Sequence, residues 1–440
     1  MRGPVRSIFL AILTIGSVTL FVKLVATGKE LYVASLFGVG DALDAFLIAF
    51  MLPSFSIAVL GSAFQSAFVP AWVQSRERDG VDAANRLTSN ATALSAGMLV
   101  AFTLILGFCF PLLEPIVASG FSPAKLELTR KLFYGLLPVI AAGGIASLWG
   151  SVLNAGERFV LVGLIPLATP VVVIGLLVAR PETDPMTLVA GTVAGAMIEL
   201  VLLAITLRRH GIPVLPRWHG LDEPTRAVVR QYLPMVAGSL LMATTTVVDQ
   251  SMAAMLGPGA VSALSYGNKI VGFVVGIAAV AIGNAVLPSF SAMVARAEWS
   301  ELRRTVRFYS LLIVGTTVPL TLGVAWFSEP IVRLLFERGA FTTADSALVA
   351  GVQRFFVLQL PFYLLGTIGV RLVSALGKNH VISTIAAVNV ALNVVLNLVL
   401  SRYLGVAGIA LSTSIVYMLS CTMVFLSLRS QLRMLETKRP

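Results

Sequence analysis

Three lysines lie inside long apolar stretches, where an ammonium group needs a partner or a watery cavity. They are Lys23, Lys29 and Lys269. A cation at the centre of a bilayer costs on the order of 2.5–3.5 kcal/mol even on a lenient insertion scale. Lysine offers a compact, rotatable charge that suits phosphate. These residues therefore predict a substrate-binding cavity for a phosphate-bearing anion.

Depth separates the intramembrane cations. Lys269 lies ten residues beyond Gly259, which is about 15 Å along a helix and near the midplane. Lys23 is expected in the outer half of its helix. Lys29 is expected nearer the surface, and Gly28 is a candidate hinge that would turn both side chains toward one cavity. Two further cations are interpreted as structural because they lie near the membrane boundaries: Arg354 and Arg371.

Carboxylates accompany the lysines. Asp41 and Asp44 open an apolar helix, where Asp41 is a plausible N-cap and Asp44 suits the positive end of the helix dipole. Asp44 is also predicted to take part in substrate binding. Asp249 and Glu199 are candidates for gating or ion coupling. Asp44 and Asp249 could pair with lysines to close an outer gate, while Glu199 is either a proton or sodium site or a helix-packing carboxyl.

The composition determines which elements carry these groups. The chain has 440 residues, of which 57% are hydrophobic and 12% charged, against about 25% charged in a soluble protein. Apolar runs of roughly 20 residues suit membrane spans. The sequence predicts an all-α polytopic membrane protein with about twelve transmembrane helices. Their expected ranges are 7–37, 42–72, 86–112, 129–153, 160–179, 187–207, 227–256, 260–294, 304–327, 346–376, 381–401 and 406–428.

The net charge of +11 reports topology. With the N-terminus inside, 20 of the 32 Lys and Arg residues fall on the inner face and seven on the outer face. This bias follows the positive-inside rule, places both termini in the cytoplasm and argues against nucleic-acid binding. The N-terminal apolar run is interpreted as an uncleaved first helix.

The loops argue against an enzyme or an ATPase. No Walker motif occurs, and the three histidines fall in basic inner loops. Cys109 and Cys421 stand alone in apolar helices and suggest neither a disulfide nor a metal site. We expect no cofactor, and the membrane potential or an ion gradient as the driving force.

Repeated motifs predict two parallel halves. "GVG" at 38–40 precedes "FVP" ending at Pro70, and "GPG" at 257–259 precedes "VLP" ending at Pro288. Such halves face a central substrate path in transporters. The predicted domains are an N-terminal six-helix lobe at 1–210, a cytoplasmic linker at 211–228 and a C-terminal six-helix lobe at 229–440. Pro53 is expected to act as a hinge in the second helix.

Several motifs together resemble the MurJ/MviN family of lipid II flippases, within the multidrug/oligosaccharidyl-lipid/polysaccharide exporter superfamily. They are "LFGVGDALDAFLIAFMLP", "SAFQSAFVP", "LSYGNKI", "LFERGAFTTADSALVA" and "RLVSALG". The resemblance implies a flippase that moves an undecaprenyl-pyrophosphate-linked saccharide from the inner to the outer leaflet. It places Lys23, Lys29 and Lys269 where the family mainly has cavity arginines, and Asp44 at the aspartate of its DAF motif.

The sequence departs from the family pattern in two ways. The second helix reads "SIAVLGSAF" where the family usually has an arginine and an EGAF glutamate, and twelve helices are expected without the additional C-terminal pair of many lipid II flippases. An exopolysaccharide or O-antigen repeat-unit flippase is therefore the alternative, followed by a multidrug/cation antiporter. The implied setting is the bacterial cytoplasmic membrane, with cell-envelope biosynthesis enzymes as possible partners.

Overall fold

The first structural unit consists of helices and their connecting segments. The computed structural model describes residues 4–156, 158–180 and 183–437, with side chains omitted at 4–15, 159, 242, 279–288 and 432–437. Contacts divide the chain into a first unit, Met1–Phe37 with Asp41–Ala243, and a second unit, Gly38–Gly40 with Thr244–Pro440. The first eight helices and the 3-10 turn η1 belong to the first unit: α1 (Pro4–Phe37), α2 (Asp41–Asp79), α3 (Val81–Val117), α4 (Pro123–Leu136), α5 (Pro138–Ala155), α6 (Phe159–Leu164), η1 (Ile165–Leu167), α7 (Ala168–Ala179) and α8 (Pro185–Arg209).

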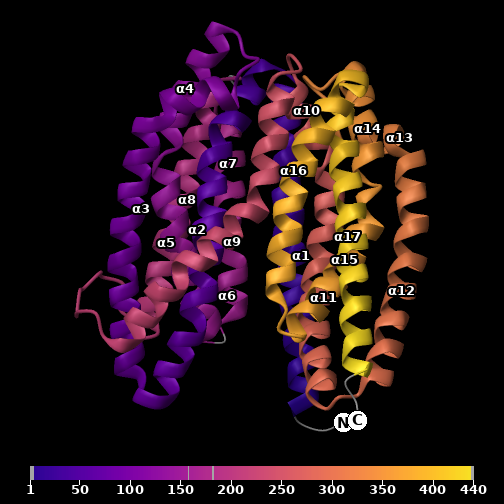
Figure 1. Cartoon of the computed structure of the whole chain (residues 1–440). Helices are drawn as coiled ribbons and strands as arrows, with labels where there is room; N and C mark the ends of the chain where they lie inside the picture. Colours follow the sequence, from indigo (N-terminus) through magenta and orange to yellow (C-terminus); the bar gives the residue numbers. More distant parts are fainter. Residues whose placement is uncertain (1–3, 157, 181–182, 438–440) are drawn as a thin grey trace. The chain divides into compact units, whose positions relative to one another are not determined.

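The second unit is built in the same way (Figure 1). The helix α9 (Glu223–Ala254) begins in the first unit and ends in the second. The remaining helices are α10 (Ala260–Gly267), α11 (Lys269–Ala295), α12 (Trp299–Trp326), α13 (Ser328–Phe336), α14 (Thr343–Phe356), α15 (Gln359–Ala375), α16 (Asn379–Leu404) and α17 (Val406–Thr437).

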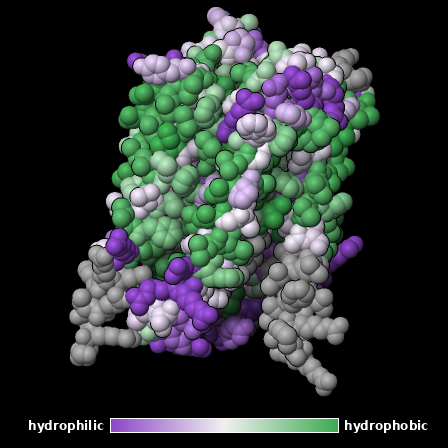
Figure 2. Space-filling view, turned by 90° about the vertical axis from the view of Figure 1, so that its right-hand side faces the viewer, coloured by the Kyte–Doolittle hydropathy of each residue, from purple (hydrophilic) through white to green (hydrophobic). Residues whose placement is uncertain are grey.

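The predicted fold class is confirmed. Within the described ranges every regular element is helical. Among the described residues, eleven helical segments are long and apolar enough to cross a membrane, and α1, with 34 residues, is long enough for a twelfth. Apolar side chains cover the middle of the face shown in Figure 2, and hydrophilic ones gather toward the ends of the helices. Such an apolar surface suits contact with lipid, since bilayer hydrocarbon replaces water around the helices.

Several predicted single helices are interrupted. The predicted helix 129–153 is split where Pro138 begins α5, and 160–179 is split by η1 around Pro166. Proline lacks the N–H that continues a helix. The predicted helix 260–294 is split at Asn268, and 346–376 is split between Phe356 and Gln359. Each unit therefore contains helices broken within an apolar stretch.

The glycines of the repeated GxG motifs turn the chain as expected. Gly38, Gly257 and Gly259 have positive φ angles of 58°, 112° and 79°, which glycine adopts readily. A side chain at Gly38 would also collide with the backbone, since its Cβ would lie 2.5 Å from the carbonyl oxygen of Ala340. The motifs are followed directly by α2 at Asp41 and by α10 at Ala260.

The segment after α8, predicted as a linker, is bonded to α3 of the first unit. Asn90 is fully buried, accepts a hydrogen bond from the His219 amide at 2.7 Å and donates one to the Gly220 carbonyl at 2.9 Å. The Arg217 amide donates to the Ser89 hydroxyl at 3.0 Å. The units divide between Ala243 and Thr244, within α9, so the compact first unit extends beyond the predicted linker.

Candidate functional site

A buried ion-pair cluster joins the start of α2 to α4. Nζ of Lys125 lies 2.6 Å from Oδ1 of Asp41 and 2.9 Å from Oδ2 of Asp44. The side chain of Asp44 is fully buried, whereas that of Lys125 is 6% exposed. The ammonium also lies 3.9 Å from the centre of the Phe121 ring, a favourable cation–π contact. The ammonium thus offsets one of the two negative charges at this end of α2.

Lys125 is one of the seven basic residues expected on the outer face of the membrane, and in the structure its side chain is buried rather than exposed to water. Ser122 caps α4 by accepting a hydrogen bond from the Lys125 amide, which fixes Lys125 in the first turn of a helix packed against α2. The Ser-Pro pair before it is a helix-start signal that could have placed it there. The structure supplies Asp44 with a cation from its own unit, and its role in substrate binding stays a prediction.

The two lysines of α1 lie on one uninterrupted helix. Lys29 Nζ pairs with Glu30 Oε1 at 2.6 Å, and both side chains are about one-quarter exposed, at 26% and 23%. Lys23 is half-buried, and its carbonyl accepts a hydrogen bond from Thr27. The helix runs through Gly28 without a break, just as α2 runs through Pro53. The hinge roles of Gly28 and Pro53 stay predictions.

Lys269 stands at a helix break in the second unit. The helix α10 ends at Gly267, and Lys269 is the first residue of α11. A cation at a helix N-terminus opposes the helix dipole, so helix stability does not account for a lysine there. Its position at an interruption of an apolar span is typical of substrate sites in transporters.

Asp249 is buried in the second unit among neutral donors. It lies on α9 and accepts hydrogen bonds from the Nδ2 atoms of Asn393 and Asn397, at 2.9 and 2.7 Å, and from the Thr413 hydroxyl at 3.1 Å. The Oδ1 atom of Asn397 is buried without a hydrogen-bond partner. A buried carboxylate is costly unless it is paired or protonated. Oxygen atoms gathered in this way suit a cation or a proton.

Glu199 lies on α8 in the first unit. Its Oε1 accepts hydrogen bonds from the hydroxyl and the amide of Thr169, at 2.6 and 3.3 Å. A cavity of about 640 Å³ within this unit includes Glu199 in its lining. The described lining residues do not include Lys23, Lys29 or Asp44, so the structure does not bring Glu199 together with them there.

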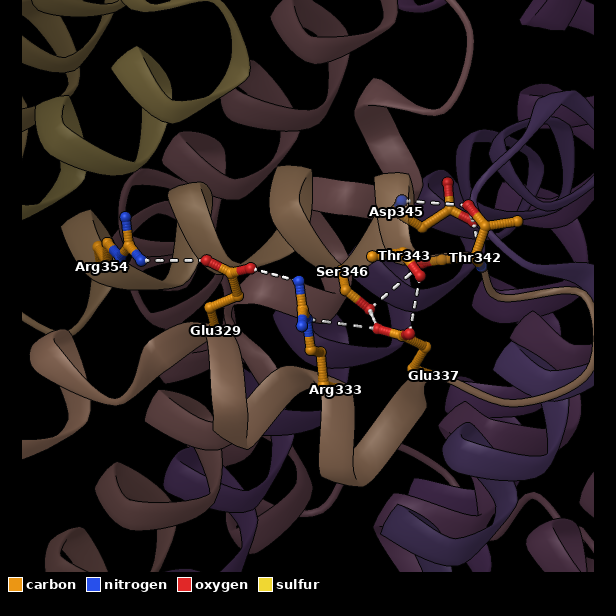
Figure 3. Close-up of polar contacts among 8 residues, drawn as sticks. All are labelled: Glu329, Arg333, Glu337, Thr342, Thr343, Asp345, Ser346 and Arg354. Atoms are coloured by element: carbon orange, nitrogen blue, oxygen red, sulfur yellow. Dashed lines mark hydrogen bonds and ion pairs between the residues drawn. The ribbon is translucent and has the colours of Figure 1, made fainter.

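A polar network links α13 to α14 in the second unit (Figure 3). Glu329 pairs with Arg333 at 2.7 Å and with Arg354 at 3.7 Å. Glu337 accepts hydrogen bonds from the hydroxyls of Ser346 and Thr343, at 2.7 and 2.8 Å. These two bonds hold the pKa of the Glu337 carboxyl below its usual value.

The same ion pair recurs in the first unit. Arg130 of α4 bonds Glu114 of α3 at 2.5 Å, as Arg354 of α14 pairs with Glu329 of α13. Both glutamates begin the sequence Glu-Pro-Ile-Val, at 114–117 and 329–332. This supports the interpretation of Arg354 as structural, and it adds a motif to the internal repeat.

Comparison with known proteins identifies the family. The family model described as "Lipid II flippase MurJ" matches residues 33–439. The chain belongs to the MurJ family. A probable lipid II flippase MurJ from Synechocystis is 27% identical over 431 residues, covering 94% of this chain and 80% of the relative. The lipid II flippase MurJ of Burkholderia cenocepacia is 25% identical, covering 97% of this chain and 84% of the relative.

Solved structures agree with the MurJ fold. A lipid II flippase MurJ in an inward closed conformation matches with a TM-score of 0.80 at 21% identity, covering 95% of this chain and 87% of the other. An inward-facing multidrug-resistance transporter of the MATE family also reaches 0.80, at 14% identity, covering 98% and 100%. The fold is therefore shared with drug transporters, whereas the sequence assigns the chain to the MurJ family.

Proposed function

We propose that this membrane protein moves an undecaprenyl-pyrophosphate-linked saccharide of the lipid II type from the inner to the outer leaflet. The observation that carries the proposal is the MurJ family match across residues 33–439. The lysines within apolar helices support it, because a pyrophosphate needs cations: Lys23 and Lys29 lie on α1, and Lys269 begins α11.

The proposed mechanism is alternating access without covalent chemistry. The pyrophosphate enters from the inner leaflet and pairs with Lys269 and Lys23, while the lipid tail stays in the bilayer. A potential that is negative inside favours outward movement of an anion by about 2.3 kcal/mol per charge per 100 mV. In this proposal the chain lies in the bacterial cytoplasmic membrane with both termini inside, next to the enzymes that make and use its substrate.

Reconstituted vesicles with fluorescent lipid II test the proposal. We expect Lys269→Ala and Lys23→Ala to lose most lipid II movement, and Lys269→Arg to retain part of it because the charge is kept. Lys131→Ala is the matched control, since Lys131 is exposed on α4. Wild-type rates in both alanine variants, with normal insertion, would refute the assignment of these lysines.

A competition experiment addresses the saccharide. An undecaprenyl-pyrophosphate-linked exopolysaccharide unit is added in excess to the lipid II assay. Lipid II movement that persists unchanged supports lipid II as the substrate. Vesicles that move the exopolysaccharide unit and leave lipid II in place would assign the alternative function.

We also propose that Asp249 couples movement to a cation or proton. Its support is the buried carboxylate surrounded by Asn393, Asn397 and Thr413. Asp249→Asn removes the charge and keeps a similar shape, so we expect folding to persist while flipping loses its dependence on ion gradients. The measurement is the flipping rate in vesicles with imposed proton or sodium gradients. A variant that still responds fully to both gradients would exclude Asp249 as the coupling site.

A further inference from the structure

One membrane-spanning segment of the first unit is broken near its start. The helix α6 ends at Leu164, the 3-10 turn η1 covers Ile165–Leu167, and α7 begins at Ala168. Pro166 and Pro170 lack the amide hydrogens that would otherwise bond to carbonyls one turn earlier. A short 3-10 stretch inside a helix often marks a hinge.

Glu199, on the neighbouring helix α8, forms hydrogen bonds to the start of α7 at this break. Its Oε1 accepts two hydrogen bonds from Thr169, the second residue of α7, one from the backbone amide and one from the hydroxyl. The carboxylate thus does for α7 what an N-cap does for an ordinary helix. Its negative charge also suits the positive end of the α7 dipole.

Glycines at a spacing of four bring the two helices together. Gly191, Gly195 and Glu199 occupy successive turns of α8. A Cβ atom at Gly195 would lie 2.5 Å from Cα of Thr169, and one at Gly191 would lie 2.9 Å from Cα of Val173. The close approach of the backbones, as in small-residue helix pairs, brings Glu199 within reach of the start of α7.

The second carboxylate oxygen of Glu199, Oε2, belongs to a side chain that lines a cavity with a mostly apolar wall and several polar groups. Among the described residues Oε2 has no hydrogen-bond or ion-pair partner. The cavity of about 640 Å³ that Glu199 lines also has amide and hydroxyl side chains in its wall. They include Gln65, Asn154, Ser147 and Thr192. Water can therefore reach Oε2, and Glu199 is the one ionisable group among the described lining residues.

Among the described contacts, no cation from the neighbouring helices forms an ion pair with Glu199. The helices α5 and α7 and the turn η1, which pack against α8, contain no ionisable residue. The ionisable groups of α2 lie near its two ends, Asp41 and Asp44 at one end and residues 76–79 at the other. Those of α4 are Lys125, Glu127, Arg130, Lys131 and Tyr134. Lys23 lies on α1, which packs against α6, η1 and α7.

We propose that Glu199 is a proton-binding site that controls the hinge between α6 and α7. A hydronium ion in the cavity transfers a proton to the Glu199 carboxylate. The carboxyl group becomes neutral, and the hydronium ion becomes a water molecule. The neutral carboxyl holds the Thr169 amide and hydroxyl less strongly, so the start of α7 is released. Loss of the proton to water restores the cap. This inference does not depend on which lipid the chain carries.

Hydrogen exchange of the full chain in lipid nanodiscs tests the site. After correction for the intrinsic effect of pH, we expect exchange in residues 164–173 to become roughly fivefold faster in acidic than in mildly alkaline buffer, the change that loss of a typical side-chain cap gives. Glu199→Gln should exchange at the fast, acidic rate at every pH. Thr169→Val keeps the charge of Glu199 and loses the hydroxyl hydrogen bond. Exchange in residues 164–173 of this variant should therefore be faster than in the wild type and should still respond to pH.

The control is Asp184→Asn, which removes the exposed carboxylate that caps α8 through the Met186 amide. It should leave the pH response of residues 164–173 unchanged. A wild-type response that survives in Glu199→Gln would overturn the proposal. So would a response to sodium at constant pH that choline does not give, because it would assign the site to a metal ion. If the wild-type protein shows the expected pH-dependent exchange in residues 164–173 but moves no lipid II, the result counts against the proposed transport function and supports this site.

Discussion

Asp44 and Lys125 form a buried ion pair that stabilises the first unit. The carboxylate of Asp44 is fully buried, and Lys125 lies 2.9 Å away with only 6% of its side chain exposed. Removing one member of a buried pair leaves an uncompensated charge, which costs about 3–5 kcal/mol. The ion pair with Lys125 therefore gives the buried carboxylate of Asp44 a structural role.

We predict that Lys125→Ala destabilises the protein by about 3–5 kcal/mol. The measurement is denaturant or thermal unfolding of the purified protein in detergent. Replacing both members, as in Lys125→Met with Asp44→Leu, should recover much of the loss, because the apolar pair leaves no buried charge. Lys131→Ala serves as the exposed control, and equal effects of Lys125→Ala and Lys131→Ala would contradict the prediction.

At the scale of elements, the connection between α13 and α14 depends on acceptor groups. Glu337 follows α13 and bonds two hydroxyls at the start of α14. Thr342 and Asp345 form a capping box at the same helix start. The turn between the two helices is therefore held by hydrogen bonds to carboxylates.

This arrangement predicts a pH dependence with a definite sign. The pKa of Glu337 is lowered in the folded chain by bonds from Ser346 and Thr343, so its contribution is complete above the unfolded value of about 4.3. It is lost as pH falls through the lower, folded value. We expect amide exchange in residues 337–346 to rise in that range. Glu337→Gln should remove this response, because the neutral side chain does not titrate.

Long apolar stretches predicted the helices, while their interruptions needed the structure. The break at Pro166 has a visible cause in the sequence, but the break at Asn268 has no proline beside it. Partner choice was equally hidden. The sequence indicated that Asp44 could pair with a lysine, but only the packing of α4 against α2 identifies Lys125 as its partner. The glutamates that pair with Arg130 and Arg354 were visible as a repeated Glu-Pro-Ile-Val.

At the scale of the whole molecule, the distribution of charge fixes the expected orientation. Basic residues concentrate in the segments predicted to face the cytoplasm, including the stretch between α8 and α9. That stretch is bonded to α3 through Ser89 and Asn90, so the first unit holds it in place. The orientation can be tested without any transport assay.

We predict opposite labelling of two single cysteines in a background with Cys109 and Cys421 replaced by serine. Both chosen positions, Lys131 and Arg217, are exposed. A membrane-impermeant maleimide should label Lys131→Cys in intact cells, and Arg217→Cys only after the membrane is opened. Labelling of Arg217→Cys in intact cells would reverse the proposed topology.

The burial of Asp44 has a practical consequence for genetic surveys of this protein. A screen that scores cell growth would rank Asp44 beside Lys23 and Lys269, because we expect variants that break the buried pair to accumulate poorly, whatever part Asp44 takes in substrate binding. Counting the protein that accumulates in each strain would separate the two causes. Positions such as Lys23 and Lys269 should then keep their abundance while losing growth.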